Sequence, residues 1–298
     1  MKNLIDYLYS IDITNIDKHD DYYLLKDNHT TYLFSKYNHY RDFDFIYNIC
    51  DELNKHYFYV YKLKKNIYNN VLSTIDNEEY YLLDIGLNYD NELDFYEMVN
   101  FYKRSSVFLN RNFNFKCNWD ILWENKIDYL HLHANNYLVS NKNISPLFFY
   151  YLGLAENALI YIKTIEKNMG FFLNDRISFT HRRMPAPIKN LFFYNPFNLM
   201  IDLEVRDIAE YIKSMYYNDL DYLNDLEYYL KTNLLTKYSA SMLYARIVYP
   251  SNFFDYYENK SEEYFSGKFS DTSGYESFIK KTYELINSYV NIDKISWL

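Results

Sequence analysis

The order of hydrophobic and polar positions makes the first ninety residues strand-rich. Residues 21–37, DYYLLKDNHTTYLFSKY, alternate around a polar tip at Asp27-Asn28-His29, which predicts a β-hairpin. Two further strands are expected in FYVYKLKKN (58–66) and EEYYLLDIGLN (78–88). Between the hairpin and these strands, residues 41–56 predict an amphipathic helix, because apolar side chains recur there at helical spacing. The first part is therefore predicted to run strand, strand, helix, strand, strand.

After Gly86 the apolar period becomes mostly helical. Seven helices are expected, at 92–105, 118–140, 145–168, 220–232, 236–249, 252–263 and 274–290. In their midst, residues 177–213 predict a short strand, a loop built around THRR, a second strand ending in MIDL, and a helix.

This order of elements is typical of a protein-kinase-like fold. We predict an α+β, aminoglycoside phosphotransferase-like chain of two lobes. Residues 1–88 would form a small, mainly-β N-lobe with one helix. Residues 89–298 would form a large, mainly helical C-lobe that carries the catalytic-loop-like segment 177–213.

Composition removes several classes of function. The formal net charge is -9 and no dense Lys/Arg run occurs, so neither nucleic acid nor a membrane surface is expected as a partner. The N-terminus has no apolar signal-peptide core, and the longest apolar runs are too short to span a bilayer, which favours a cytoplasmic protein. Cys50 and Cys117 have no metal-type spacing and predict no disulfide framework, and the helical pattern around Cys50 makes it a core residue.

Residues 177–213 carry the candidate chemistry. Small-molecule kinases use a loop written H-x-D-x-x-x-x-N, in which Asp takes the hydroxyl proton, followed by a metal-binding Asp at a strand end. Here His181 matches the loop histidine, but Arg183 stands at the base position. A guanidinium cannot accept a proton at neutral pH. The arginine therefore argues for ligand binding without turnover.

The metal ligands of such a loop are partly retained. Ile188 stands where the loop asparagine is expected, and Asn190 would serve if the loop has grown by two residues. Asp202 ends a hydrophobic strand, where a magnesium-binding aspartate belongs. Arg206 and Asp207 follow at the start of the next helix and are predicted as structural supports.

A nucleotide site would draw on the first lobe. Lys36 ends the second hairpin strand, and Glu52 in the next helix is its candidate partner, although a solvated strand end is the stronger interpretation of Lys36. Leu83 and Asp84 belong to a candidate hinge strand whose backbone would bind adenine. His131 and His133 are a close histidine pair, but a helix would point them apart, so a surface pair is favoured over a metal site.

Several phrases resemble a known family. FFYYLGLAENALIYIKTIE (148–166), PFNLMIDLEVRDIAEYIK (196–213), LYARIVYPSNFFDYYE (243–258) and the ending KISWL are similar to the YutH/CotS-type spore-coat proteins of low-GC Gram-positive bacteria. The resemblance covers roughly residues 118–298. It implies the kinase-like fold of the aminoglycoside phosphotransferase superfamily, association with the spore coat in an organism that sporulates, and kinase motifs that are commonly degraded.

Three functions stay open at this point. The first is a catalytically degenerate kinase-like protein that binds a nucleotide, a small ligand or a protein partner such as a spore-coat protein. The second is a working ATP-dependent phosphotransferase with an atypical loop, acting on a small-molecule hydroxyl. The third is a purely structural coat protein. ATP and Mg²⁺ are the cofactors that the first two would use.

Overall fold

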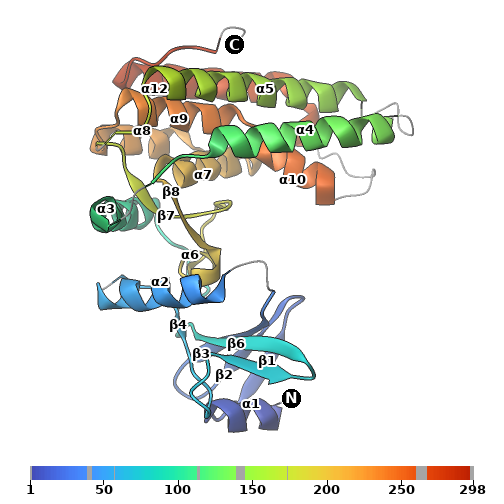
Figure 1. Ribbon diagram of the computed structural model, residues 1–298, viewed down its shortest axis with the longest axis vertical. Coiled ribbons are helices and arrows are strands. Elements are labelled where there is room, and N and C mark those ends of the chain that lie inside the picture. The colour runs from blue at the N-terminus through green and yellow to red at the C-terminus, as the bar shows by residue number, and fades with distance from the viewer. Residues whose placement is uncertain are drawn as a thin grey trace. The chain divides into compact units, whose positions relative to one another are not determined.

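The computed structural model describes residues 2–38, 42–56, 58–112, 115–138, 145–172, 174–259 and 267–295. It divides into two compact units (Figure 1). The sheet unit comprises Met1–Asp94 and Pro187–Leu199, and the helical unit comprises Phe95–Ala186 and Met200–Leu298. The sheet unit thus extends to Asp94 rather than to residue 88, and it also takes in Pro187–Leu199, which the sequence analysis assigned to the C-lobe.

The sheet unit is built around six antiparallel strands. They are β1 (Asn15–Lys18), β2 (Tyr22–Lys26), β3 (Thr31–Lys36), β4 (Lys62–Leu63), β5 (Leu72–Ile75) and β6 (Glu78–Asp84). The order across the sheet is β1-β2-β3-β6-β4, and β5 pairs with β6. The predicted hairpin is present as β2 and β3, with Leu24 opposite Leu33.

Helices and turns cover the two faces of this sheet. The helices are α1 (Lys2–Tyr9), α2 (Phe43–Lys55), α6 (Asn190–Phe193) and the 3-10 turn η1 (Pro196–Asn198). Because side chains alternate along a strand, Tyr32 and Phe34 of β3 pack with α1 on one face, while Leu33 lies on the other. That other face packs against Phe43 of α2 and Phe197 of η1.

The sequence analysis missed some elements of the sheet unit. It did not predict α1, β1, β5 or α6, and the expected strand over 58–66 shrinks to Lys62–Leu63. Only those two residues pair with β6, opposite Asp84 and Leu83. The aromatic residues before them pack by their rings instead, with Tyr59 and Tyr61 both against Tyr194.

The helical unit packs helices around one buried helix, α9 (Lys237–Val248). Its other helices are α3 (Phe95–Asn112), α4 (Trp119–Leu138), α5 (Ser145–Asn168), α7 (Val205–Tyr217), α8 (Leu223–Thr232), α10 (Ser251–Asn259), α11 (Gly267–Ser270) and α12 (Thr272–Tyr289). Every residue of α9 from Tyr238 onward is buried, and α9 packs against α5, α7 and α12 (Figure 1). All seven predicted helices are present, as α3, α4, α5, α8, α9, α10 and α12, and α5 has the predicted bounds.

A two-stranded sheet, β7 (Ile177–His181) with β8 (Leu199–Leu203), enters the helical unit and leads into α7. This is the strand, loop, strand, helix arrangement predicted for 177–213. The ends of the predicted helices at 140 and 260–263, and Ser296–Leu298 of the KISWL ending, lie outside the described residues. Within the described residues, no helix is long and apolar enough to cross a membrane.

Candidate functional site

His181 ends β7 and is completely buried. Its backbone N–H donates to both carboxylate oxygens of Asp207, at 2.9 Å each, and its Nδ1 lies 2.6 Å from Asp207 Oδ2. Tyr102 of α3 donates its hydroxyl to the same carboxylate at 2.6 Å. Asp207 therefore anchors the start of the loop to α7 and α3.

Arg183, which stands at the predicted base position, is held by a carboxylate from α10. Its Nε lies 2.5 Å from Asp255 Oδ2 and one terminal nitrogen 3.1 Å from Oδ1, which is the bidentate geometry of a strong Arg–carboxylate pair. Glu210 Oε2 lies 3.8 Å from the same Nε. Burial would lower the pKa of Arg183, but Glu210 and Asp255 outweigh it and raise that pKa above its usual value. The residue at the predicted base position therefore stays protonated at neutral pH.

Asp202, the candidate metal ligand at the end of β8, is only 5% exposed. The indole Nε1 of Trp119 donates to both its oxygens at 3.0 and 2.9 Å, and Arg206 reaches Oδ2 at 2.5 Å. The backbone N–H of Leu203 donates to Oδ1 at 2.7 Å. A bare Mg²⁺ at these oxygens would have to displace a guanidinium of like charge and an indole N–H. The carboxylate as placed here does not fit a magnesium site.

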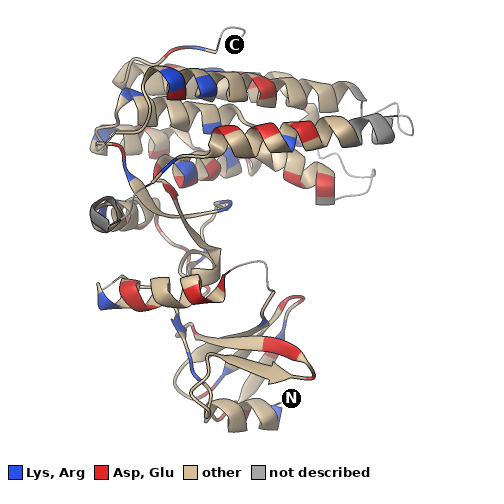
Figure 2. Cartoon of the chain, viewed as in Figure 1, with Lys and Arg blue, Asp and Glu red and all other residues tan. Residues whose placement is uncertain are grey.

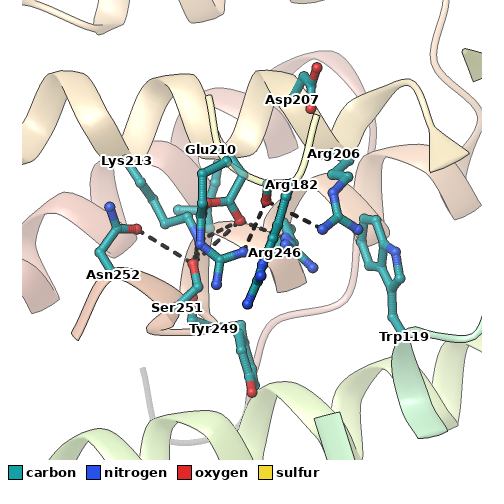
Figure 3. A network of polar contacts seen from close by, with 12 residues as sticks. Trp119, Arg182, Arg206, Asp207, Glu210, Lys213, Arg246, Tyr249, Ser251 and Asn252 are labelled. Atoms are coloured by element: carbon teal, nitrogen blue, oxygen red, sulfur yellow. Dashed lines mark hydrogen bonds and ion pairs between the residues drawn. The ribbon is translucent and has the colours of Figure 1, made fainter. Parts of the chain in front are cut away.

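Arg206 also ties this carboxylate to the loop. Its Nε donates to the carbonyl of His181 at 2.9 Å, and a terminal nitrogen donates to the carbonyl of Arg182 at 3.3 Å (Figure 3). One arginine thus links the end of β7, the loop and the end of β8, and its contacts are those of a support.

A second buried network lies on the same helix, one turn further along. Glu210 Oε1 accepts from Lys213 Nζ at 3.1 Å and from Arg246 Nε at 2.7 Å. Lys213 is fully buried and also donates to Ser251 Oγ at 2.6 Å and to the carbonyl of Tyr249 at 3.2 Å (Figure 3). One buried carboxylate therefore serves two buried cations.

Arg246 is also stacked. Its guanidinium lies 5.0 Å from the ring centroid of Trp119 and 5.8 Å from that of Trp123, which is cation–π distance. The sequence analysis noticed the phrases RDIAEYIK and LYARIVYP but gave Glu210, Lys213 and Arg246 no role. The available signal was a Glu and a Lys three residues apart in a helix whose neighbouring positions are apolar.

The protonation of this network follows from its charges. Burial would raise the pKa of Glu210, but Lys213, Arg246 and Arg183 outweigh it and hold that pKa well below its usual range. Burial, with the neighbouring cations Arg246 and Arg183, lowers the pKa of Lys213 to about 7 despite the opposing effect of Glu210. The lysine is therefore the group in this network that changes charge near neutral pH.

In the sheet unit, the predicted pair of Lys36 and Glu52 is not formed. Lys36 Nζ lies 2.8 Å from Glu78, with both side chains nearly half exposed, while Glu52 contacts Lys55 at 3.0 Å. The reason is the alternation of the strand. Lys36 follows Tyr32 and Phe34 at intervals of two and so belongs to the α1 face, whereas α2 covers the opposite face. Their assignment to a nucleotide site stays a prediction that these contacts do not support.

Leu83 and Asp84 end β6 as expected, but with different exposure. Leu83 is fully buried in the sheet core, and Asp84 Oδ1 accepts from Thr30 Oγ1 at 2.8 Å and from the N–H of Gly86 at 3.2 Å. Gly86, at φ +67°, turns the chain away from the strand in a conformation that favours glycine. Asp84, Gly86 and Tyr59 line a pocket of about 400 Å³.

Asn190, predicted as a displaced loop asparagine, lies in the sheet unit. Its backbone N–H donates to the carbonyl of Asn91 and its side-chain Nδ2 to that of Asn88, both at 3.0 Å. Its Oδ1 is buried without a hydrogen-bond partner. A metal site shared by Asn190 and Asp202 stays a prediction.

Other candidates from the sequence have simple surroundings. Cys50 and Cys117 are free and buried, and the core position predicted for Cys50 is confirmed. His131 Nε2 lies 2.9 Å from Glu156 Oε1, and the side chain of His133 lies outside the described residues. The described residues hold no group of three or more His, Cys, Asp and Glu side chains placed to bind a metal ion.

Comparison with known proteins decides the family. The family model described as "Spore coat putative kinase YutH" matches residues 2–292. The chain belongs to the YutH spore-coat family. It is 25% identical over 210 residues to the endospore coat-associated protein YutH of Bacillus subtilis strain 168. That match covers 60% of this chain and 61% of the relative, so it spans about three fifths of the curated protein's length.

Solved structures show the fold of this YutH-family chain. Spectinomycin phosphotransferase, solved with ADP and spectinomycin, matches with a TM-score of 0.58 at 9% identity, over 95% of this chain and 97% of that one. An aminoglycoside phosphotransferase from Alicyclobacillus acidocaldarius matches with a TM-score of 0.54 at 11% identity, over 95% and 94%. Amicoumacin kinase, solved with AMP-PNP and Ca²⁺, matches with a TM-score of 0.55 at 10% identity, over 95% and 92%. The predicted aminoglycoside phosphotransferase-like fold and the predicted family are confirmed.

Proposed function

We propose that this chain is a catalytically degenerate member of the YutH family, which binds a protein partner and transfers no phosphate. The observation that carries the proposal is that one acidic function of the predicted loop is replaced by an arginine and the other is paired with one. The base position holds Arg183, bound to Asp255, and the metal position holds Asp202, bound to Arg206 and Trp119. Loss of a general base alone costs about 10²–10⁴-fold in rate. The pairing of Asp202 with an arginine would also remove the contribution of a metal ion bound there.

The ATP and Mg²⁺ expected from the sequence have no support from Asp202. Nucleotides and a divalent ion occur in the solved complexes of similar fold. In this chain the corresponding chemistry would require Asp202 to exchange Arg206 for a cation, and Arg206 is itself bound to the loop carbonyls. A protein-binding role makes no such demand.

The outward face of α4 supports a protein partner. Ile121, Leu122, Tyr129 and Leu132 lie on one side of this helix and are 44–72% exposed. Exposed apolar side chains that lie together often mark a protein interaction site, whereas single scattered ones do not. Asp120, Glu124 and Asp128 recur at intervals of four along the same helix. Figure 2 shows acidic segments along α4. We therefore propose an apolar protein segment flanked by Lys or Arg as the occupant.

Turnover is tested with ATP, Mg²⁺ and the purified chain. We expect no phosphate release above a mock preparation, either in the wild type or in Asp202→Ala. Release in the wild type that is lost in Asp202→Ala would contradict the proposal and favour an atypical small-molecule phosphotransferase.

The exposed apolar side of α4 is tested with two synthetic amphipathic helical peptides, one of Leu and Lys and one of Leu and Glu. We expect the Lys peptide alone to bind, and Leu122→Ser with Leu132→Ser to weaken it by about tenfold or more. Leu234→Ser is the matched control, because Leu234 is 97% exposed and lies outside α4. Equal binding of both peptides, or an equal loss in the control, would contradict the assignment.

A further inference from the structure

One face of the sheet corresponds to the nucleotide face of a kinase fold. In that fold the nucleotide lies beneath the sheet, on the face where the third-strand lysine meets a glutamate from the following helix. Here that face is the one covered by α2, and its central side chains are Leu24, Leu33 and Leu83. Ser35, next to Lys36, is the β3 residue that shares this face, opposite Tyr81. The third strand therefore offers the face a hydroxyl and no cation.

The chain's own residues cover this face. The covering segment, Pro187–Leu199, belongs to the same compact unit, and Leu191, Tyr194 and Phe197 of it pack against the face. Phe197 stacks on Tyr81 with ring centroids 4.0 Å apart and an interplanar angle of 21°. Leu24, Leu33 and Leu83 are left 5%, 3% and 0% exposed. A stacked aromatic ring thus covers Tyr81 on this face of the sheet.

The covering segment is also bonded to the chain that follows β6, at residues 89–93. The N–H groups of Asn190 and Leu191 donate to the carbonyls of Asn91 and Tyr89, at 3.0 and 2.8 Å. Leu93 N–H donates in return to the carbonyl of Ile188 at 2.8 Å. These hydrogen bonds lie within the sheet unit and fix the covering segment to the chain that leaves β6.

The end of the segment is fixed in the same way. The N–H of Tyr61 donates to the carbonyl of Tyr194 at 3.0 Å, and the Tyr194 ring meets that of Tyr59 edge-to-face at 4.7 Å. Asn195 accepts from the N–H of Phe197 at 3.0 Å and so caps the turn that presents the ring. Both halves of the covering segment are therefore bonded to the sheet unit.

We infer that the covering segment is an intramolecular substitute for the nucleotide: Leu191, Tyr194 and Phe197 occupy the nucleotide face and exclude adenine nucleotides from it. The inference extends the proposed function by removing nucleotides from the ligands that the chain binds at this face. ADP binding without turnover would contradict the inference and leave the proposed function standing. Turnover would contradict the proposed function itself.

The test uses ADP as the probe and calorimetry as the readout, on the full chain. We expect no measurable ADP binding by the wild type at millimolar concentration. Phe197→Ala removes the stacked ring, and we expect it to lower the dissociation constant for ADP by at least about tenfold, as expected for a base that regains a stacking partner. Phe197→Leu removes the aromatic ring but keeps most of the side-chain volume. It replaces the alanine variant in the test if that variant does not fold.

Phe34→Ala is the matched control. Phe34 lies on β3, stacks on Tyr80 at 4.9 Å, and is buried on the opposite face of the same sheet. The Phe34→Ala variant should gain no ADP affinity, because its cavity opens on the face opposite to the predicted nucleotide face. ADP binding by the wild type in the micromolar range would overturn the inference. So would an equal gain in Phe34→Ala, or no gain in either Phe197 variant.

Discussion

The covered face of the sheet unit and the loop of the helical unit are filled by different kinds of interaction. The sheet face is closed by leucines and aromatic rings, with Phe197 stacked on Tyr81. The loop is closed by ion pairs, with Arg206 on Asp202 and Arg183 on Asp255. Apolar cover gains free energy from the area removed from water. Buried ion pairs gain little net free energy, but breaking one of them is costly.

This difference means that the two regions should respond to different perturbations. The stability of the sheet face should change with side-chain volume and hardly at all with pH. The stability of the helical unit should change with the charge of single residues, because Glu210 is paired with both Lys213 and Arg246 away from water. The predictions below test this distinction, from the largest effect to the smallest.

Glu210→Gln should have the largest effect. It leaves Lys213 and Arg246 buried without their carboxylate, and such a loss costs about 3–5 kcal/mol of the free energy of unfolding. Urea unfolding measures it. Glu258→Gln is the control, because its partner Lys126 is about one third exposed and such a pair contributes at most about 1 kcal/mol. Equal losses in the two variants would show that Glu210 contributes no more to stability than a partly exposed ion pair does.

Phe197→Ala should cost about 2–3 kcal/mol, as expected for a partly buried ring that loses its stacking partner. The loss should be the same at pH 6 and pH 9, because no charge is involved. Phe172→Ala, at a 63% exposed position, should change the free energy of unfolding by less than about 0.5 kcal/mol. A loss below that of the control would mean that the covering segment is not held by its aromatic ring.

The pH dependence should identify Lys213. Its folded pKa of about 7 lies below its usual value of 10.5. At pH below 7 the ammonium is protonated in both states, and the cost of burying it is fully present. Between pH 7 and 10.5 the unfolded chain holds a proton that the folded chain has released, so the free energy of unfolding rises with pH.

The rise from this one group is at most about 1.4 kcal/mol per pH unit. Lys213→Met should remove it, which unfolding experiments at pH 7, 8 and 9 would measure as a flatter profile than that of the wild type. Identical profiles would contradict the position of Lys213 as the titrating member of the network.

Magnesium should have the smallest effect. Since Asp202 is already paired, exchanging EDTA for millimolar Mg²⁺ at constant ionic strength should leave the melting temperature unchanged. A site filled at a hundredfold excess over its dissociation constant would add about 2.7 kcal/mol. A magnesium-dependent rise that disappears in Asp202→Ala would show that the cation can displace Arg206.

The sequence alone predicted much of the helical unit. The repeat of apolar residues located α5 at its observed bounds, and a hydrophobic strand ending in Asp202 located β8 and the loop before it. These signals are local, because periodicity depends only on neighbouring positions. The polar first strand β1 and the short β5 carried no such signal, and the sequence analysis did not predict them.

Which groups meet was decided only by the tertiary structure. Sequence spacing predicted Asp202 as a metal ligand, yet Trp119, from a helix far earlier in the chain, donates to it together with Arg206. The alternation of β3 put Lys36 on one face, but only the packing of α1 and α2 decided that this face is the wrong one for Glu52. The type of a residue and its position in the local hydrophobic pattern determine which groups it can bind. What it does bind depends on partners distant in sequence, which a local pattern does not contain.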